Sequence, residues 1–329
     1  MNLLLPVLAA LTVSLAATAC GGSSANAQGG NRLTLVAYST PREAYEELTK
    51  DFARTAEGKD VSFDQSYGSS GEQSRAVESG LRADVVAFSL APDVERLVEA
   101  GLVAKGWSDD QYDGMVTRSV VVFAVRKGNP EGIREWSDLV RDGIEVITPN
   151  PFTSGGARWN VMAAYGAQRK LGASHDEAVE YLRELFRQVS VQDKSARESL
   201  QTFVGGKGDV LIAYENEAFT AREKGEELDW VIPDQTILIE NPIAVTKDAG
   251  EKARAFVDYL RTEEAQGIFE EKGYRTILGD PREQTTWPNP KTLFTIRDLG
   301  GWDEVQAAFF DREAGIVAGI QREVGAALE

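Results

Sequence analysis

The sequence has very few of the side chains that catalytic and metal sites use most often. In 329 residues it has one histidine, His175, and one cysteine, Cys20. A single cysteine excludes a disulfide within the chain, and a single histidine leaves nucleophilic triads and histidine-rich metal sites short of residues. His175 stands in the segment GASHDEA, at the start of an expected helix, where a surface role is the simplest interpretation. We therefore expect no metal ion, no cofactor and no enzyme of these classes.

Positive charge is also scarce. The chain has 35 Lys+Arg against 52 Asp+Glu, a formal net charge of −17. This balance argues against nucleic acid and against an anionic membrane surface as partners. The glycine-rich signatures of nucleotide phosphate loops are missing as well. A small anion is not excluded, because a site made of backbone N–H groups needs no lysine or arginine.

Long apolar runs are confined to the N-terminus. Residues 3–19 read LLLPVLAALTVSLAATA, which predicts a secretory signal peptide over 1–19. Cys20 follows directly, and a small, polar, glycine-rich stretch completes 20–31, which predicts a flexible tether. This order resembles the lipobox of bacterial lipoproteins, and it implies an extracytoplasmic protein, in the periplasm or at the cell surface, anchored through lipidated Cys20. The alternative is an ordinary signal peptide with Cys20 as a free thiol.

From Arg32 onward, short apolar runs alternate with longer amphipathic ones, the pattern of an α/β fold. The expected strands are 33–39, 61–68, 83–89, 119–130, 145–149, 189–193, 208–216, 229–234 and 237–247. The expected helices are 41–55, 70–79, 93–100, 156–171, 175–189 and 196–204, followed by a mainly helical C-terminal region.

Two of the expected strands are longer than usual. The runs at 119–128 and 237–247 bracket a central block of the chain, and two such strands would allow the chain to cross into a second lobe and return. We therefore predict one lobe from 32–118 plus 244–329 and another from 119–243. Lobes joined in this way can close on a ligand.

Four expected strand ends lead into helix starts that are rich in serine, threonine and glycine. They are Tyr38–Pro41, Tyr67–Gly71, Thr153–Gly156 and Lys194–Arg197. Each has an ordinary explanation, because these residues cap helices everywhere. In open α/β sheets, however, ligands bind at the carboxyl ends of strands. We expect backbone N–H groups, with the hydroxyls of Ser70 and Ser154, to converge there on one tetrahedral anion.

A catalytic alternative depends on two carboxylates. Glu215 and Glu217, in the segment AYENEA, are expected near the cleft. A pair of carboxylates is the minimum for sugar hydrolysis, so an enzyme on this scaffold with Glu215 as acid or base stays open.

Several segments together carry a family resemblance. TPNPFTSGGARWN, DQSYGSSGEQ, RADVVAFSLAPDV, VVFAVRKGNP, GDVLIAYENEA and LFTIRDLGGW occur in this order. The chain resembles the sulfate-binding proteins of bacterial ABC importers over nearly all of its length after Leu33. The resemblance implies a two-lobed fold of the type II periplasmic-binding-protein class, each lobe a mixed sheet flanked by helices. It also implies a monomer that closes around sulfate and delivers it to a membrane permease.

The resemblance implies a set of ligand-binding positions. Its backbone donors fall on Ser39, Ser70, Gly155, Gly156 and Ala196, and its serine hydroxyl donor falls on Ser154. The family's tryptophan indole donor falls on Tyr214, a departure that leaves thiosulfate, or a molybdate- or tungstate-type oxyanion, as alternative ligands. The family's aspartate at position 39 is here Ser39.

Two arginines directly follow the helix starts that are expected to bind the anion. Arg158 and Arg197 are expected to stand behind the ligand and orient its loops, with a plain surface role as the alternative. Sulfate has no proton at neutral pH and needs donors only, which agrees with helix starts that lack Asp and Glu. A surface lipoprotein with a structural or signalling role is the remaining alternative of another class.

Overall fold

The computed structural model of the chain describes residues 31–284 and 286–328. The predicted signal peptide, Cys20 and nearly all of the predicted tether lie outside these residues. No helix in the described part of the chain is both long enough and apolar enough to cross a bilayer.

The described residues form ten strands that belong to one continuous sheet of mixed direction. The strands are β1 (Arg32–Tyr38), β2 (Ser62–Gly68), β3 (Val85–Ala87), β4 (Met115–Arg126), β5 (Val146–Ile147), β6 (Val189–Val191), β7 (Val210–Tyr214), β8 (Leu228–Val231), β9 (Gln235–Val245) and β10 (Thr292–Phe294).

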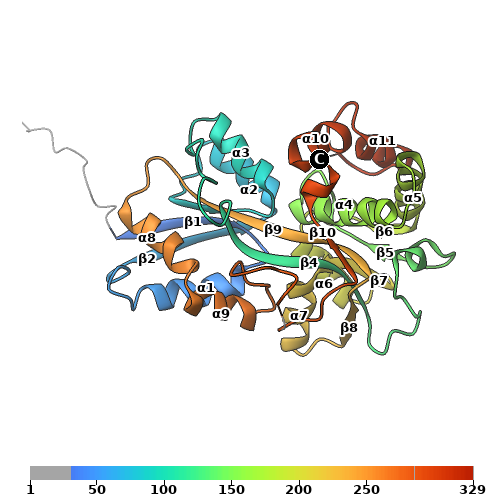
Figure 1. Cartoon of the computed structure of the whole chain (residues 1–329), viewed down its shortest axis with the longest axis horizontal. Helices are drawn as coiled ribbons and strands as arrows, with labels where there is room; N and C mark the ends of the chain where they lie inside the picture. The colour runs from blue at the N-terminus through green and yellow to red at the C-terminus, as the bar shows by residue number, and fades with distance from the viewer. Residues whose placement is uncertain (1–30, 285, 329) are drawn as a thin grey trace, which may run out of the picture.

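Helices cover both faces of this sheet (Figure 1). The α-helices are α1 (Arg42–Phe52), α2 (Ser70–Glu78), α3 (Ala91–Glu99), α4 (Gly155–Lys170), α5 (His175–Gln188), α6 (Ala196–Val204), α7 (Glu215–Glu223), α8 (Glu251–Leu260), α9 (Glu263–Glu271), α10 (Gly301–Phe309) and α11 (Ile316–Glu323). Two short 3₁₀ helices span Trp136–Val140 and Ile296–Leu299.

The first lobe is built on β1, β2, β3 and the end of β9. Strand β1 pairs in parallel with both β2 and β3, and β3 pairs antiparallel with β9 at 243–245. Apolar side chains of α1, α8 and α9 form one core on this part of the sheet, and those of α2 and α3 form another. The sheet is therefore sandwiched between helices, as near-continuous apolar strands such as β1 require.

The second lobe repeats this plan around β5, β6 and β7. Strand β5 pairs in parallel with β6 and with β7, and β7 pairs antiparallel with β4 at 121–125. Helices α4 and α5 cover one face of this part, and α6 and α7 cover the other. Strands β4 and β9 pair with each other between the lobes and run into both, as Figure 1 shows. The predicted class, a two-lobed α/β fold joined by two crossing strands, is confirmed.

Of the C-terminal helices, α8 and α9 complete the first lobe as the predicted boundary 244–329 requires, but α10 and α11 do not. Phe309 and Phe310 of α10 and Val317 of α11 share one apolar core with residues of α4 and α5. Trp159 of α4 stacks edge-on against Trp302 of α10 at 4.8 Å between ring centres. These contacts place the end of the chain on the second lobe, because the apolar face of α4 needs a cover that the central block does not provide.

Candidate functional site

Six strand-to-helix junctions meet at one place between the lobes. In the first lobe, α1, α2 and α3 follow β1, β2 and β3, and in the second, α4, α6 and α7 follow β5, β6 and β7. Because the three strands of each set are parallel, their carboxyl ends lie on one edge of the sheet. The two edges face each other, so the N-termini of six helices point into the space between them.

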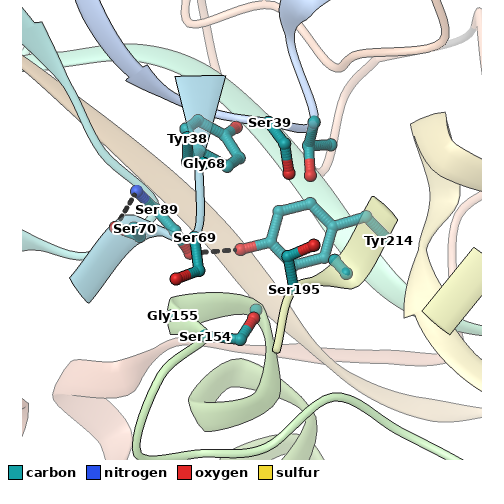
Figure 2. Close-up of a pocket in the computed structure, with 13 residues that line it drawn as sticks. Tyr38, Ser39, Gly68, Ser69, Ser70, Ser89, Ser154, Gly155, Ser195 and Tyr214 are labelled. Carbon is teal, nitrogen blue, oxygen red and sulfur yellow. Dashed lines mark hydrogen bonds between the residues drawn. The ribbon is translucent and has the colours of Figure 1, made fainter. Parts of the chain in front are cut away.

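That space is a pocket with a free volume of about 10 Å³, about the room that one water molecule needs. Pockets that hold drug-sized ligands have volumes of about 300–1,000 Å³, so this one suits a guest of only a few atoms. Its lining residues are Tyr38, Ser39, Thr40, Gly68, Ser69, Ser70, Ser89, Ser154, Gly155, Gly156, Ser195, Ala196 and Tyr214. Figure 2 shows several of their hydroxyls directed toward the pocket. All seven predicted ligand-binding positions lie in this wall, and none of the lining residues carries a charged side chain.

Backbone N–H groups at these helix starts have no partner within their own helix. The first four N–H groups of any α-helix lack an intrahelical acceptor, and the helix dipole adds positive potential at the same end. At α2 and α4 the capping residues, Ser69 and Ser154, make no side-chain capping bond. At α6 the capping explanation is correct, because Ser195 accepts a bond from the N–H of Glu198 at 3.2 Å. The pocket therefore faces the positive ends of several helix dipoles and their free N–H groups.

The two hydroxyls predicted to face the anion differ in their surroundings. Among the described residues, the Ser154 hydroxyl has no hydrogen-bond partner, although the residue is buried. The Ser70 hydroxyl donates to Oδ2 of Asp93 at 2.6 Å and accepts from the N–H of Ser89 at 3.0 Å. The prediction that the Ser70 hydroxyl faces the anion is therefore wrong, because the hydroxyl already donates one hydrogen bond and accepts another within the first lobe. Its backbone N–H remains at the start of α2.

Tyr214 reaches across the pocket to a residue that sequence reasoning missed. Its phenol oxygen lies 2.7 Å from Oγ of Ser89, at the junction of β3 and α3 (Figure 2). The prediction extended the strand through position 89 and started the helix at 93, so this junction was overlooked. Pro92 at the beginning of α3 was the available signal, since proline favours the first turn of a helix. Burial raises the pKa of the Tyr214 phenol, which therefore keeps its proton at neutral pH.

Arg197 links the lobes beside the pocket without entering it. Its Nη1 lies 2.7 Å from Oε1 of Glu43 on α1, and its Nη2 donates to the carbonyl of Thr40 at 3.1 Å. The same guanidinium contacts Glu217 on α7 at 3.1 Å. Lys224 forms a second ion pair with Glu43. Burial alone would raise the pKa of Glu43, but hydrogen bonds from Arg197 and Lys224 lower it to about 2.

Arg158 supports the loop that precedes α4. Its Nε donates to the carbonyl of Pro151 at 2.8 Å, and its Nη1 donates to Gln306 of α10 at 2.6 Å. Burial lowers its pKa to about 10, so it stays charged at neutral pH. The structure thus places Arg158 and Arg197 behind the pocket wall, each bonded to a carbonyl of a loop beside it.

The carboxylates of the enzyme alternative are engaged elsewhere. Glu215 is completely buried and forms an ion pair with Arg275, whose Nε lies 2.8 Å from its Oε2. Glu217 binds Arg197, and neither carboxylate lines the pocket. Glu215 therefore follows the pocket residue Tyr214, near the cleft as expected, but its carboxylate does not face the pocket and is not placed for acid–base chemistry there. His175 is exposed, as expected, and bonds to the Tyr165 hydroxyl at 3.0 Å.

Two lobes that meet over a small, uncharged, donor-lined pocket define the class of two-lobed solute-binding proteins. Residues 33–275 match the family model described as a bacterial extracellular solute-binding protein. The chain belongs to this family. Among solved structures, the sulfate-binding protein SubI of Mycobacterium tuberculosis is 41% identical, with a TM-score of 0.82 over 85% of this chain and all of that one.

Curated relatives with similar names extend over most of the chain. The sulfate-binding protein of Synechococcus elongatus is 41% identical over 89% of this chain and 88% of its own length. The sulfate-binding protein of Escherichia coli is 40% identical over 85% of this chain and 90% of its own length. The thiosulfate-binding protein of Pseudomonas aeruginosa is 34% identical over 90% of this chain and 93% of its own length. The family resemblance predicted from the sequence is confirmed.

Proposed function

We propose that the protein captures sulfate in the pocket between its lobes and delivers it to an ABC importer in the membrane. The observation that carries this proposal is a pocket wall made of six helix N-termini with serine, threonine and tyrosine side chains, and with no charged side chain. Sulfate at neutral pH has no proton to donate, so it requires hydrogen-bond donors alone. Relatives that are named for sulfate binding support the same ligand.

Uncharged donors can supply enough free energy for such a site. A hydrogen bond to a charged group contributes about 1.5–3 kcal/mol. Six or seven of these bonds, reduced by the desolvation of a dianion, are compatible with a micromolar dissociation constant, about −8 kcal/mol. Helix dipoles add to this without any counter-ion. We infer that the protein binds its ligand unchanged and has no catalytic role.

Isothermal titration of the sulfate-free protein with sulfate tests the proposal. We expect saturable binding of one anion per chain, with a dissociation constant in the micromolar range. Chloride at the same ionic strength is the control, because a monovalent sphere cannot engage tetrahedrally arranged donors. The absence of binding at millimolar sulfate would contradict the proposal.

Thiosulfate is the second candidate ligand, and a molybdate- or tungstate-type anion is the third. Tyr214 has a phenol at the position where the resemblance implies a tryptophan indole, and this difference is the reason to test these other anions. A relative named as a thiosulfate-binding protein, 34% identical, is a second reason to test thiosulfate. Competition titrations against bound sulfate separate these ligands. Sulfate is expected to bind at least as tightly as thiosulfate, because a terminal sulfur accepts hydrogen bonds poorly and is larger than oxygen.

The proposed partner and location follow from the same function. A protein that delivers sulfate to an importer acts outside the cytoplasm, and it works as a monomer at the permease. Cys20, if acylated, would tether it to the membrane. The mass of the mature N-terminus, measured on protein purified from membranes, tests for the lipid.

A further inference from the structure

Ser89 of the first lobe makes four polar contacts around the site. Its N–H donates to the Ser70 hydroxyl, and its carbonyl accepts from Nε1 of Trp159 at 2.9 Å and from Nδ2 of Asn241 at 3.2 Å. The residue is 1% exposed. These bonds fix its backbone, so the hydroxyl is the one polar group of Ser89 that remains free to rotate.

That hydroxyl forms a pair with the phenol of Tyr214, at 2.7 Å across the lobes. Both residues line the pocket, as Figure 2 shows. Each group has one proton and can donate or accept. One proton is used between the two oxygens, and the other is left for a ligand. The pair therefore has two arrangements, which differ in the group that presents its proton to the pocket.

Acidity selects between the two arrangements when an anion is bound. A phenol, with an ordinary pKa near 10, is a much stronger acid than an aliphatic hydroxyl, and hydrogen bonds to a charged acceptor strengthen with donor acidity. The lower free energy is reached when Tyr214 donates to the anion and Ser89 donates to Tyr214. In this arrangement a lone pair of the phenol oxygen is occupied by the Ser89 proton.

We propose that Ser89 is a positioning and specificity-determining residue, whose hydroxyl donates to the Tyr214 oxygen and makes Tyr214 a donor only toward the bound anion. The inference rests on the proposed function, since it concerns selection within the same pocket. An indole has no lone pair on its N–H and is a donor without help. A phenol can also accept, and the Ser89 proton competes with any proton that a ligand would offer to the phenol oxygen. The chemical consequence is discrimination against tetrahedral anions that keep a proton.

Hydrogen phosphate is the informative competitor, because at mildly alkaline pH it is a dianion like sulfate and differs by one proton. In Ser89→Ala the lone pair that the Ser89 proton occupied is open to that proton. Sulfate affinity is expected to fall by about tenfold, the loss of one hydrogen bond, and phosphate affinity by much less. The ratio of the two dissociation constants therefore changes by about fivefold.

Tyr214→Trp is the matched background. Because the indole is a donor in any case, adding Ser89→Ala to it is expected to leave the sulfate-to-phosphate ratio unchanged. Ser89→Cys, which is similar in size and a weak donor, is expected to shift the ratio in the same direction as Ser89→Ala. Ser89→Cys is the variant to use if Ser89→Ala does not fold, and a circular-dichroism melt shows whether Ser89→Ala folds.

Three results have distinct meanings in these titrations. A sulfate-to-phosphate ratio of dissociation constants that rises in Ser89→Ala and not in the tryptophan background supports the inference. Equal losses for both anions in Ser89→Ala, the result of a merely structural role, would overturn it while the proposed function stands. A wild-type protein that does not bind sulfate would overturn the proposed function itself.

Discussion

At the scale of single residues, Gly155 and Gly156 differ in the space that surrounds them. A Cβ at position 155 would lie 2.7 Å from Cβ and Oγ of Ser89 and 2.9 Å from Leu90, all in the opposite lobe. A Cβ at position 156 would have its nearest neighbours at 3.4–3.5 Å, which is ordinary contact. The first glycine is required for the lobes to meet, and the second is not.

Gly155→Ala is therefore expected to weaken sulfate binding by a hundredfold or more, about 3 kcal/mol, because the closed arrangement becomes sterically forbidden. Gly156→Ala is the control and should weaken binding by about tenfold or less. Both variants should melt near the wild-type temperature without ligand, since an open form relieves the contact. Titration calorimetry and thermal melts measure these effects, and equal affinities of the two variants would contradict the placement of the lobes.

Glu215 offers a test that separates stability from binding. Glu215→Gln leaves the buried guanidinium of Arg275 without its counter-charge, and breaking a buried pair in this way costs about 3–5 kcal/mol. Urea unfolding should detect this loss. Sulfate affinity of the folded variant should stay within about twofold of wild type, because the side chain is not part of the pocket wall. A stable variant that has lost its function would favour the catalytic alternative.

At the scale of elements, the pocket is a product of strand direction. Any parallel set of strands followed by helices brings helix N-termini to one edge, so the alternation of apolar and amphipathic runs was enough to predict four of the six junctions. The pairing of Ser89 with Tyr214 was not predictable, because it joins residues 125 positions apart through the closure of the lobes. Nor was the cover of α4 by the C-terminal helices, since amphipathic periodicity shows an apolar face without showing its partner.

The ion pair between α1 and α6 is expected to stabilise the closed arrangement. Glu43→Gln should weaken sulfate binding by about fivefold, about 1 kcal/mol, the range of a partly exposed pair. Glu46→Gln on the same helix is the control, because Glu46 is exposed and has no ion pair among the described residues. An unchanged affinity in Glu43→Gln, measured at low ionic strength, would show that the pair makes no contribution to closure.

The same pair sets a pH dependence. The pKa of Glu43 is lowered from 4.5 to about 2 in the closed arrangement, so its contribution is complete above about pH 4.5 and is lost as pH falls toward 2. At neutral pH the phenol of Tyr214 is protonated and sulfate is fully ionised. Sulfate affinity is accordingly expected to be constant across neutral pH and to fall only in acid, which titrations over a pH series measure.

At the scale of the whole molecule, the lobes are closed over an uncharged pocket in a strongly acidic protein. A formal net charge of −17 repels a dianion at long range, and the pocket must overcome this with local dipoles. Ser89 with Tyr214 and Glu43 with Arg197 are contacts that exist only when the lobes meet. The two crossing strands, β4 and β9, allow the lobes to separate, and the only first-lobe side chains that would leave the second lobe's core among the described residues are Tyr38 and Leu90.

The most direct test of this account is a crystal structure of the protein loaded with sulfate. It should show one tetrahedral ion between the lobes, within hydrogen-bond distance of the N–H groups of Ser39, Ser70, Gly155, Gly156 and Ala196, of the Ser154 hydroxyl and of the Tyr214 phenol. An empty pocket in the loaded protein, or a sulfate ion in direct contact with a lysine, an arginine or a metal ion, would contradict it.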